Sequence, residues 1–288
     1  MERELTHDWD RAIARARTLA TSHEAGASIL SFYAELLGAQ AVVFRQLRAG
    51  SAPAPTLERN LAALRPHVPV ILDAVARAGP EALADEARRL LRTWGPPSGG
   101  PDAGGPSTWG PPLGGPDAGT DELERVLTDC WRAPDDRQFF AKAILQPYGR
   151  WLAECGVTPE DRPLPRTGNR CPFCGGLPQL SVLHDAGELQ GGGRLLLCAT
   201  CLTPWPFSRV VCACCGEEDD RRLGYFHAPA FDHLRVDGCE SCRRYIKTVD
   251  LTRLGLAVPL VDEVAGAPLD LWARDHGYEK IELNLVGL

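Results

Sequence analysis

The spacing of the cysteines is the strongest constraint on how this chain can fold. Four Cys-x-x-Cys pairs lie within residues 171–242: Cys171/Cys174, Cys198/Cys201, Cys212/Cys215 and Cys239/Cys242. The first two pairs are separated by 23 residues, as are the last two, and each cysteine of the first half has a counterpart 41 positions later. Gly175 maps onto Gly216, and Arg194 onto Arg235, at the same offset. Four equal offsets indicate a tandem repeat of one small unit.

Paired Cys-x-x-Cys motifs are typical of a tetrahedral metal site. Two residues between cysteines form a tight knuckle that directs both sulfurs at one ion, and two knuckles supply the four thiolates that suit zinc or mononuclear iron. A unit this short buries little apolar surface, so we expect the metal to contribute on the order of 10 kcal/mol to its folding. Equal halves favour one metal per half, although an interleaved site built from Cys171/Cys174 and Cys212/Cys215 is an alternative.

The segment "VCACCGE" (211–217) holds a third cysteine, Cys214, between two predicted ligands. At the 41-residue offset Cys214 corresponds to Phe173, so we predict that Cys212 and Cys215 bind the metal and that Cys214 does not. Exchange of Cys214 with Cys212 is the alternative. The histidines near these motifs are His184, His227 and His233. We expect them to contact a partner or to lie outside the metal's own ligands, because four thiolates already complete each site.

Other uses of the cysteines fit the sequence less well. The first twenty residues have no apolar run typical of a secretory signal, and no stretch approaches 18 consecutive apolar residues. We therefore expect a cytoplasmic protein without a membrane span, in a compartment where Cys-x-x-Cys pairs favour metal over disulfides. A thioredoxin-type redox motif usually occurs once per domain, which disfavours that interpretation of four repeated pairs.

The cysteine-poor first half is predicted to be helical. Residues 1–157 contain several segments with apolar residues at helical spacing, and Pro66 and Pro69 predict a break within one of them. The segment "TWGPPSGGPDAG" (93–104) recurs as "TWGPPLGGPDAG" (108–119), so we expect a flexible, exposed Pro/Gly loop over 93–119. Trp94 and Trp109 would be the anchors if this loop instead docked a partner.

The cysteine-rich half is predicted to form small β units. Segments such as "LPQLSVLH" and "GRLLLCATC" in the first unit, and "HLRVDGC" and "RRYIKTVDL" in the second, have strand character. The predicted fold class is α+β. The predicted parts are a helical domain (1–157), a linker (158–170), a first metal ribbon (171–210), a second metal ribbon (211–250) and a C-terminal helical tail (251–288).

These motifs resemble a known family. The order "RCPFCGGLP…LLLCATCLTPWPFSRVVCACCG…YFHAP…LRVDGCESCRRYIKTVD", with the ending "PLDLWARDHGYEKIELNLVG", is similar to the formate dehydrogenase accessory protein FdhE family. The resemblance implies two rubredoxin-like sites with the eight paired cysteines as ligands to iron. It also implies a cytoplasmic factor that binds the immature formate dehydrogenase catalytic subunit. We expect no enzymatic activity, because the sequence contains no nucleophile elbow, phosphate-binding loop or His-Glu-x-x-His motif. The duplicated loop departs from the family pattern.

Three functions follow from these observations. The first is a maturation chaperone that uses metal-braced units to present a recognition surface, with Trp205, Phe207, Tyr225, Phe226 and Tyr245 as candidate anchors or, more simply, core residues. The second is a rubredoxin-like electron carrier, which requires iron because zinc is not redox-active. The third is a zinc-ribbon nucleic-acid binder. The net charge of −7, and equal numbers of basic and acidic side chains over 166–250, disfavour the third. Arg243, Arg244 and Lys247 form a local basic cluster that could meet an acidic partner.

Overall fold

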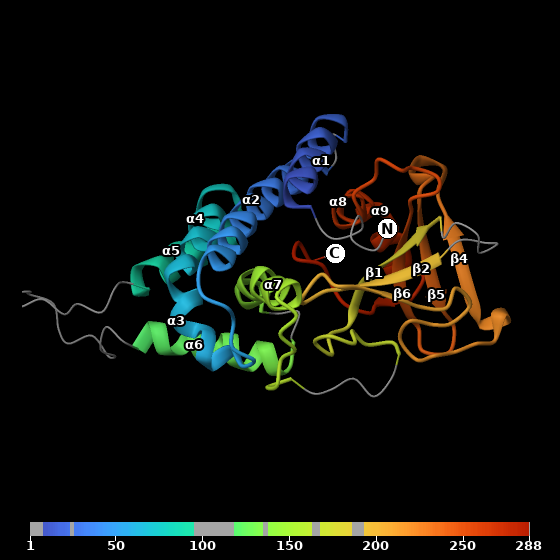
Figure 1. Ribbon diagram of the computed structural model, residues 1–288. Coiled ribbons are helices and arrows are strands. Elements are labelled where there is room, and N and C mark those ends of the chain that lie inside the picture. The colour runs from blue at the N-terminus through green and yellow to red at the C-terminus, as the bar shows by residue number, and fades with distance from the viewer. Residues whose placement is uncertain are drawn as a thin grey trace, which may run out of the picture.

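The computed structural model describes residues 8–23, 26–94, 118–134, 138–162, 168–185 and 193–287. Within these ranges the first half is helical, and the second half is a sheet followed by short helices, which is the α+β class expected from the sequence (Figure 1). Residues 95–117 of the duplicated segment, including Trp109, lie outside the described residues, as do residues 163–167 of the predicted linker. The predicted domain boundaries stay predictions.

The helices of the first half pack around a central pair, the second and the last helix of the series. They are α1 (Trp9–Ser22), α2 (Ala27–Ala49), α3 (Leu57–Leu64), α4 (Val68–Ala78), α5 (Glu81–Thr93), α6 (Ala118–Arg132) and α7 (Phe139–Glu154). Helix α2 packs against α1, α4 and α7, and α7 lies between the helices and the sheet (Figure 1). The break expected at Pro66 and Pro69 is confirmed. A short 3-10 turn (Arg65–His67) separates α3 from α4 there, because proline cannot donate a helical hydrogen bond.

Helix α2 is long and apolar enough to cross a membrane by length and composition. In the fold, 61% of its most apolar window is buried. Leu30, Leu36 and Leu37 are fully inaccessible to solvent. Core helices pass the same composition test, so this helix alone is weak evidence for a membrane span.

The strands of both cysteine units form one continuous sheet. They are β1 (Pro178–His184), β2 (Gly193–Cys198), β3 (Pro204–Pro206), β4 (Leu223–His227), β5 (Leu234–Cys239), β6 (Arg244–Asp250) and β7 (Glu279–Lys280). The order is β3-β2-β1-β6-β5-β4, with β7 beside β6. Strands β1 and β6 pair in parallel and join the two units, whereas neighbouring strands within each unit are antiparallel. The sequence did not predict this merger.

The repeat is preserved in the strand register. In the first unit Leu195 of β2 pairs with Pro206 of β3, and 41 positions later Val236 of β5 pairs with Lys247 of β6. Helices α8 (Pro259–Ala265) and α9 (Ala267–Asp275) follow the sheet, and α8 contacts β6, β1 and α1. The C-terminal segment therefore ties the second unit to the helical half.

Candidate metal centres

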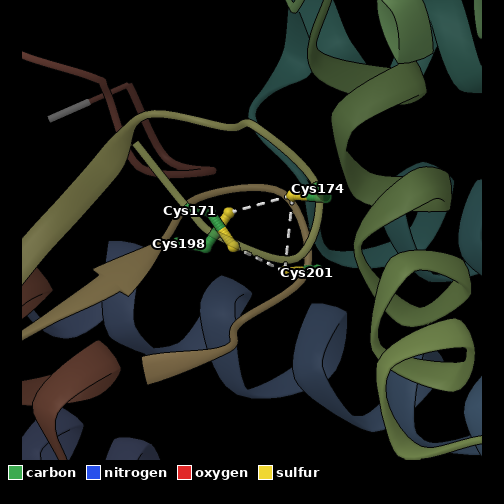
Figure 2. Close-up of side chains that lie close together, drawn as sticks. All are labelled: Cys171, Cys174, Cys198 and Cys201. Carbon is green, nitrogen blue, oxygen red and sulfur yellow. Dashed lines mark hydrogen bonds between the residues drawn. The ribbon is translucent and has the colours of Figure 1, made fainter. Parts of the chain in front are cut away.

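The first four paired cysteines converge on one point. The Sγ atoms of Cys174 and Cys198 are 3.4 Å apart, those of Cys174 and Cys201 are 3.5 Å apart, and those of Cys171 and Cys201 are 3.6 Å apart. Figure 2 shows the four sulfurs directed toward one another from two loops. All four residues are buried. They are called the first quartet below.

The remaining four paired cysteines form a second quartet. The Sγ atoms of Cys212 and Cys242 are 3.8 Å apart, and so are those of Cys215 and Cys239. These two contacts match the Cys171–Cys201 and Cys174–Cys198 contacts of the first quartet at the 41-residue offset. The pairing is sequential, and the interleaved alternative of Cys171/Cys174 with Cys212/Cys215 is not formed in the described residues.

Backbone geometry explains why each knuckle can direct two sulfurs at one point. Gly175 and Gly216 follow the first knuckle of each unit with φ of 71° and 78°, a left-handed conformation that glycine adopts without steric cost. Each glycine N–H donates to the carbonyl of the knuckle's first cysteine, at 2.8 Å for Cys171 and 3.1 Å for Cys212. Leu202 and Arg243 take the same left-handed role after the second knuckles.

Both quartets fit a tetrahedral cation. Zinc–thiolate bonds of about 2.3 Å at tetrahedral angles place neighbouring sulfurs about 3.8 Å apart. The observed separations of 3.4–3.8 Å match this spacing. All eight residues are free cysteines. Backbone N–H groups also point at sulfur, from Thr200 to Cys198 Sγ at 3.3 Å and from Cys214 to Cys212 Sγ at 3.4 Å. Such donors moderate thiolate charge. Each quartet can therefore hold one metal ion.

The pKa values of the thiols indicate how readily each quartet can release its protons when a cation binds. Burial raises the pKa of Cys212 to about 11, and it raises that of Cys201 well above its ordinary value. Burial also acts on Cys239, but backbone N–H groups of Cys242 and Ser241 outweigh it and lower the pKa of this thiol. Because the ligands of a metal are thiolates, binding must release protons from each quartet.

Helix α7 holds the first quartet from the helical side. Pro147 lies inside α7 and cannot donate to the Ala143 carbonyl, which instead accepts a hydrogen bond from Gln40 Nε2 at 2.9 Å. Gln40 also donates to Gln146 Oε1 at 3.1 Å, and Gln146 Nε2 donates to the Ala199 carbonyl at 3.0 Å. Ala199 is the residue after Cys198, so this buried relay connects α2 and α7 to the second knuckle.

Arg194 links the two units. Its guanidinium donates to Ser181 Oγ at 2.8 Å within the first unit and to the Val211 carbonyl, next to Cys212, at 3.0 Å. It also pairs with Asp237 at 3.3 Å. Burial lowers the pKa of Arg194, and the negative charge of Asp237 opposes that shift. The repeat counterpart, Arg235, binds the same carboxylate at 2.7 Å, so one half-buried aspartate serves both arginines.

The other sequence-predicted residues have varied positions. Cys214 lies beside the second quartet but is not one of its four residues, and no histidine in the described residues joins either quartet. His233 instead contacts Asp262 at 2.9 Å. Cys130 and Cys155, two cysteines outside the paired motifs, lie in segments of helical pattern that predict core-facing positions for both. Cys130 is buried, which confirms the prediction, whereas Cys155 is exposed because it follows the last turn of α7, so the prediction is wrong for Cys155.

The candidate aromatic anchors divide between core and surface. Trp205 and Tyr245 are buried, Phe207 and Phe226 are half-buried, and Tyr225 is 42% exposed. The expected basic cluster does not form one surface patch, because the Lys247 side chain is fully buried. Lys247 pairs with Glu263 at 3.1 Å and with Asp270.

Sequence reasoning missed a buried charge network around that lysine. Lys280 of β7 also pairs with Glu263 and Asp270, while Tyr245 donates to Asp270 Oδ1 at 2.7 Å. Asn284 donates to Glu263 Oε2 at 2.7 Å. The members come from β6, α8, α9 and the C-terminal segment, and their charges balance. The sequence did contain a signal for this network. Glu263 and Asp270 lie at helical spacing among the mainly apolar residues on the buried faces of α8 and α9.

Comparisons with known proteins agree with this architecture. A family model described as "FdhE, central domain" matches residues 170–209, and one described as "FdhE, C-terminal domain" matches residues 210–286. The crystal structure of the FdhE protein from Pseudomonas aeruginosa superposes with a TM-score of 0.64 over 98% of this chain and 97% of that one. At 21% identity this likeness concerns the fold.

Curated relatives match over the cysteine-rich half. A protein described as "Protein FdhE homolog" from Aquifex aeolicus (strain VF5) is 40% identical over 119 residues, which are 41% of this chain and 42% of the relative. A relative of the same description from Pseudomonas putida is 31% identical over 121 residues, which are 41% of this chain and 38% of the relative. The matched region therefore spans less than half of each of these relatives.

Proposed function

We propose that this chain, whose residues 170–286 match the central and C-terminal FdhE domain models, is a cytoplasmic, non-enzymatic accessory factor in the maturation of formate dehydrogenase. The observation that carries the proposal is the convergence of all eight paired cysteines into two quartets within the matched region. In this proposal the first quartet and the second quartet each bind one iron or zinc ion.

The residues around the quartets explain what the metals would contribute. A bound ion joins two knuckles at the open end of a short hairpin, one before its first strand and one after its second, and so it fixes loops that have little apolar core of their own. The residues that hold one ion are Cys171, Cys174, Cys198 and Cys201, and those that hold the other are Cys212, Cys215, Cys239 and Cys242. The two sites share one sheet and the Arg194–Asp237 pair, so they brace one surface.

The client in this proposal is the immature catalytic subunit of formate dehydrogenase. Exposed apolar groups support a docking surface beside the second quartet, because Val210 is 58% exposed and Tyr225 is 42% exposed. They are neighbours, since Tyr225 donates a hydrogen bond to the Arg209 carbonyl at 3.3 Å. Aromatic residues that are partly exposed on a rigid framework are frequent anchors of protein interfaces.

Co-purification with a tagged formate dehydrogenase catalytic subunit tests this function. Wild-type protein is expected to bind the subunit, and the double variant Val210→Ser/Tyr225→Ser is expected to bind it less. Leu256→Ser is the matched control, because Leu256 is 76% exposed and is not part of the Val210–Tyr225 surface. Equal capture of wild-type protein by an unrelated metalloenzyme, or no capture at all, contradicts the proposal.

Electron transfer is a second candidate, favoured by the partial exposure of the second quartet. A single iron ion in four thiolates changes oxidation state without leaving its site, and an exposed edge shortens the distance to a partner. Protein purified without oxygen would then be coloured and would bleach with dithionite. Colourless protein that contains only zinc rules out this second function and leaves the accessory role intact.

A further inference from the structure

The two quartets are repeats of one unit, yet they differ in what covers them. In the first quartet every cysteine is at most 2% exposed. In the second quartet Cys215 is exposed and Cys242 is half-buried, while Cys212 and Cys239 are buried. Two sites with the same ligands and the same knuckle geometry therefore differ in the solvent exposure of their cysteines.

Glycines seal the first quartet. A Cβ at Gly176 would lie 2.8 Å from Cys198 Sγ and 2.9 Å from Thr200 Oγ1, so the backbone rests directly on the sulfurs. On the other side, a Cβ at Gly149 of α7 would lie 3.1 Å from the Thr200 carbonyl and 3.2 Å from Cys201. The relay from Gln146 to the Ala199 carbonyl holds α7 in this position. An approach to these sulfurs from the side of α7 therefore requires α7 to separate from the second knuckle.

The equivalent positions in the second unit are occupied by polar side chains, which leave the second quartet more accessible to solvent. At the 41-residue offset Gly176 becomes Glu217, Ala199 becomes Glu240, and Thr200 becomes Ser241. Glu240 and Ser241 are exposed. The cover consists of side-chain contacts, with Ser241 Oγ donating to Glu217 Oε2 at 2.5 Å and Arg222 Nη1 donating to Ser241 at 3.4 Å. Ser241 is thus exposed and held by side chains, whereas its counterpart Thr200 lies against α7 at Gly149. Side-chain contacts, rather than the backbone of a helix, therefore cover this part of the second quartet.

A further thiol lies beside the open site. Cys214 is half-buried beside the second quartet, and its backbone N–H donates to Cys212 Sγ at 3.4 Å, whereas its repeat counterpart is Phe173, which packs against the core. The Cys214 sulfur is thus available to bind an ion as it leaves the second quartet, next to the exposed ligand Cys215. Ligand exchange at a tetrahedral thiolate site is faster when an incoming donor can approach without unfolding of the chain.

From this difference we propose that the first quartet holds a permanent metal and the second quartet holds an exchangeable one. The inference rests on the proposed binding of one metal per quartet. Exchange proceeds at Cys215 and Cys242, where a thiol or a chelating ligand from solution replaces a cysteine sulfur. The second site then gains or loses its ion while the first keeps the fold together.

Chelator competition on the full-length protein tests the inference. Protein that holds two zinc ions is mixed with the chromophoric chelator 4-(2-pyridylazo)resorcinol, and released zinc is followed in time. One equivalent is expected to leave at least about tenfold faster than the other, because only the slow one needs a local opening of the fold. Protein that binds neither zinc nor iron overturns both the metal role and this inference. Two zinc ions released at one rate overturn the inference alone.

Thiol labelling assigns the two phases without any variant. Iodoacetamide is added during chelation, and the modified cysteines are identified by mass spectrometry of peptides. Cys155 is the internal reference for an exposed thiol that binds no metal. Cys215 and Cys242 are expected to be modified in the fast phase, and Cys171 and Cys201 only in the slow phase. The reverse order contradicts the proposal.

The variant Gln146→Leu, which removes the contact of α7 with Ala199, is expected to accelerate the slow phase only.

Discussion

Leu202 and Arg243 adopt the same left-handed backbone conformation, with φ of 55° and 57°, at equivalent positions of the two repeats. Each follows the last cysteine of its unit, and each N–H donates to the carbonyl of the preceding knuckle's first cysteine, at 3.2 Å for Leu202 and 2.9 Å for Arg243. Residues other than glycine rarely take this conformation, which costs about 1–2 kcal/mol. Its presence in both units shows that the knuckle geometry takes precedence over local preference.

A β-branched residue at Arg243 is expected to weaken the second knuckle. Arg243→Val should lower the free energy of unfolding by about 1–2 kcal/mol relative to Arg243→Asn, because asparagine tolerates the left-handed conformation and valine does not. Both variants lose the contacts of Arg243 with Glu240 and the His276 carbonyl, so the comparison isolates the backbone. Thermal unfolding measures the difference. Equal stability of the two variants contradicts this account of the knuckle.

The two neighbouring cysteines of "VCACCGE" are expected to behave differently. Cys212→Ser removes a member of the second quartet and should reduce the metal content by one ion per chain. Cys214→Ser should leave the metal content unchanged, because Cys214 is not one of the four converging residues. Elemental analysis of both purified variants decides between them. Loss of metal in Cys214→Ser, with retention in Cys212→Ser, indicates the exchanged ligand set instead.

Gly149 is expected to tolerate no side chain larger than a hydrogen atom without cost. Gly149→Val should destabilise the protein by about 1–3 kcal/mol, because overpacking separates α7 from the second knuckle. Gly38→Ala in α2 is the control, since a Cβ there meets nothing within 4 Å. That helix substitution should instead stabilise by about 0.5–1 kcal/mol. Chemical denaturation measures both, and a neutral Gly149→Val would contradict the tight contact between the halves.

The buried charge network is expected to be sensitive to the loss of one partner. Glu263→Gln leaves the buried Lys247 and Lys280 with a single carboxylate, Asp270, and should cost about 3–5 kcal/mol. The control is Glu279→Gln, which removes an exposed partner of Arg244 and should cost about 0–1 kcal/mol. Denaturation at neutral pH compares them. Similar small losses in both would show that the network contributes little.

Asp262 is expected to make stability fall in acid. Burial raises the pKa of this carboxyl, but hydrogen bonds from His233, Arg15 and the Val258 N–H outweigh it and lower the pKa below its ordinary value of 3.8. The group therefore stabilises the fold above that ordinary value, and the contribution is lost as the pH falls through the lower, folded pKa. Asp262→Asn should be less stable than wild type at neutral pH, and the difference should shrink below about pH 4. A difference that is constant with pH would contradict this assignment.

The sequence predicted the site better than it predicted the arrangement around it. The cysteine offsets gave the two quartets and the exclusion of Cys214, because ligand spacing is a local property of each knuckle. The helical half and the break at Pro66 also follow from local propensity. The parallel pairing of β1 with β6, which merges the units, depends on contacts between distant segments that no local pattern encodes.

Burial was the least predictable property. Lys247 resembles a surface cation in sequence, but it is fully buried because Glu263 and Asp270, from later helices, supply its partners. Cys155 resembles a core residue, but it lies past the last turn of α7. The contrast between a sealed quartet and an open one likewise arises from α7 and from the backbone at Gly176, which both lie against the first quartet.

X-ray absorption spectroscopy of anaerobically purified protein, combined with elemental analysis, tests the central claim most directly. The account predicts two metal ions per chain, each with four sulfur neighbours at about 2.3 Å. Protein with no bound metal, or with the eight paired cysteines joined as disulfides, would contradict it.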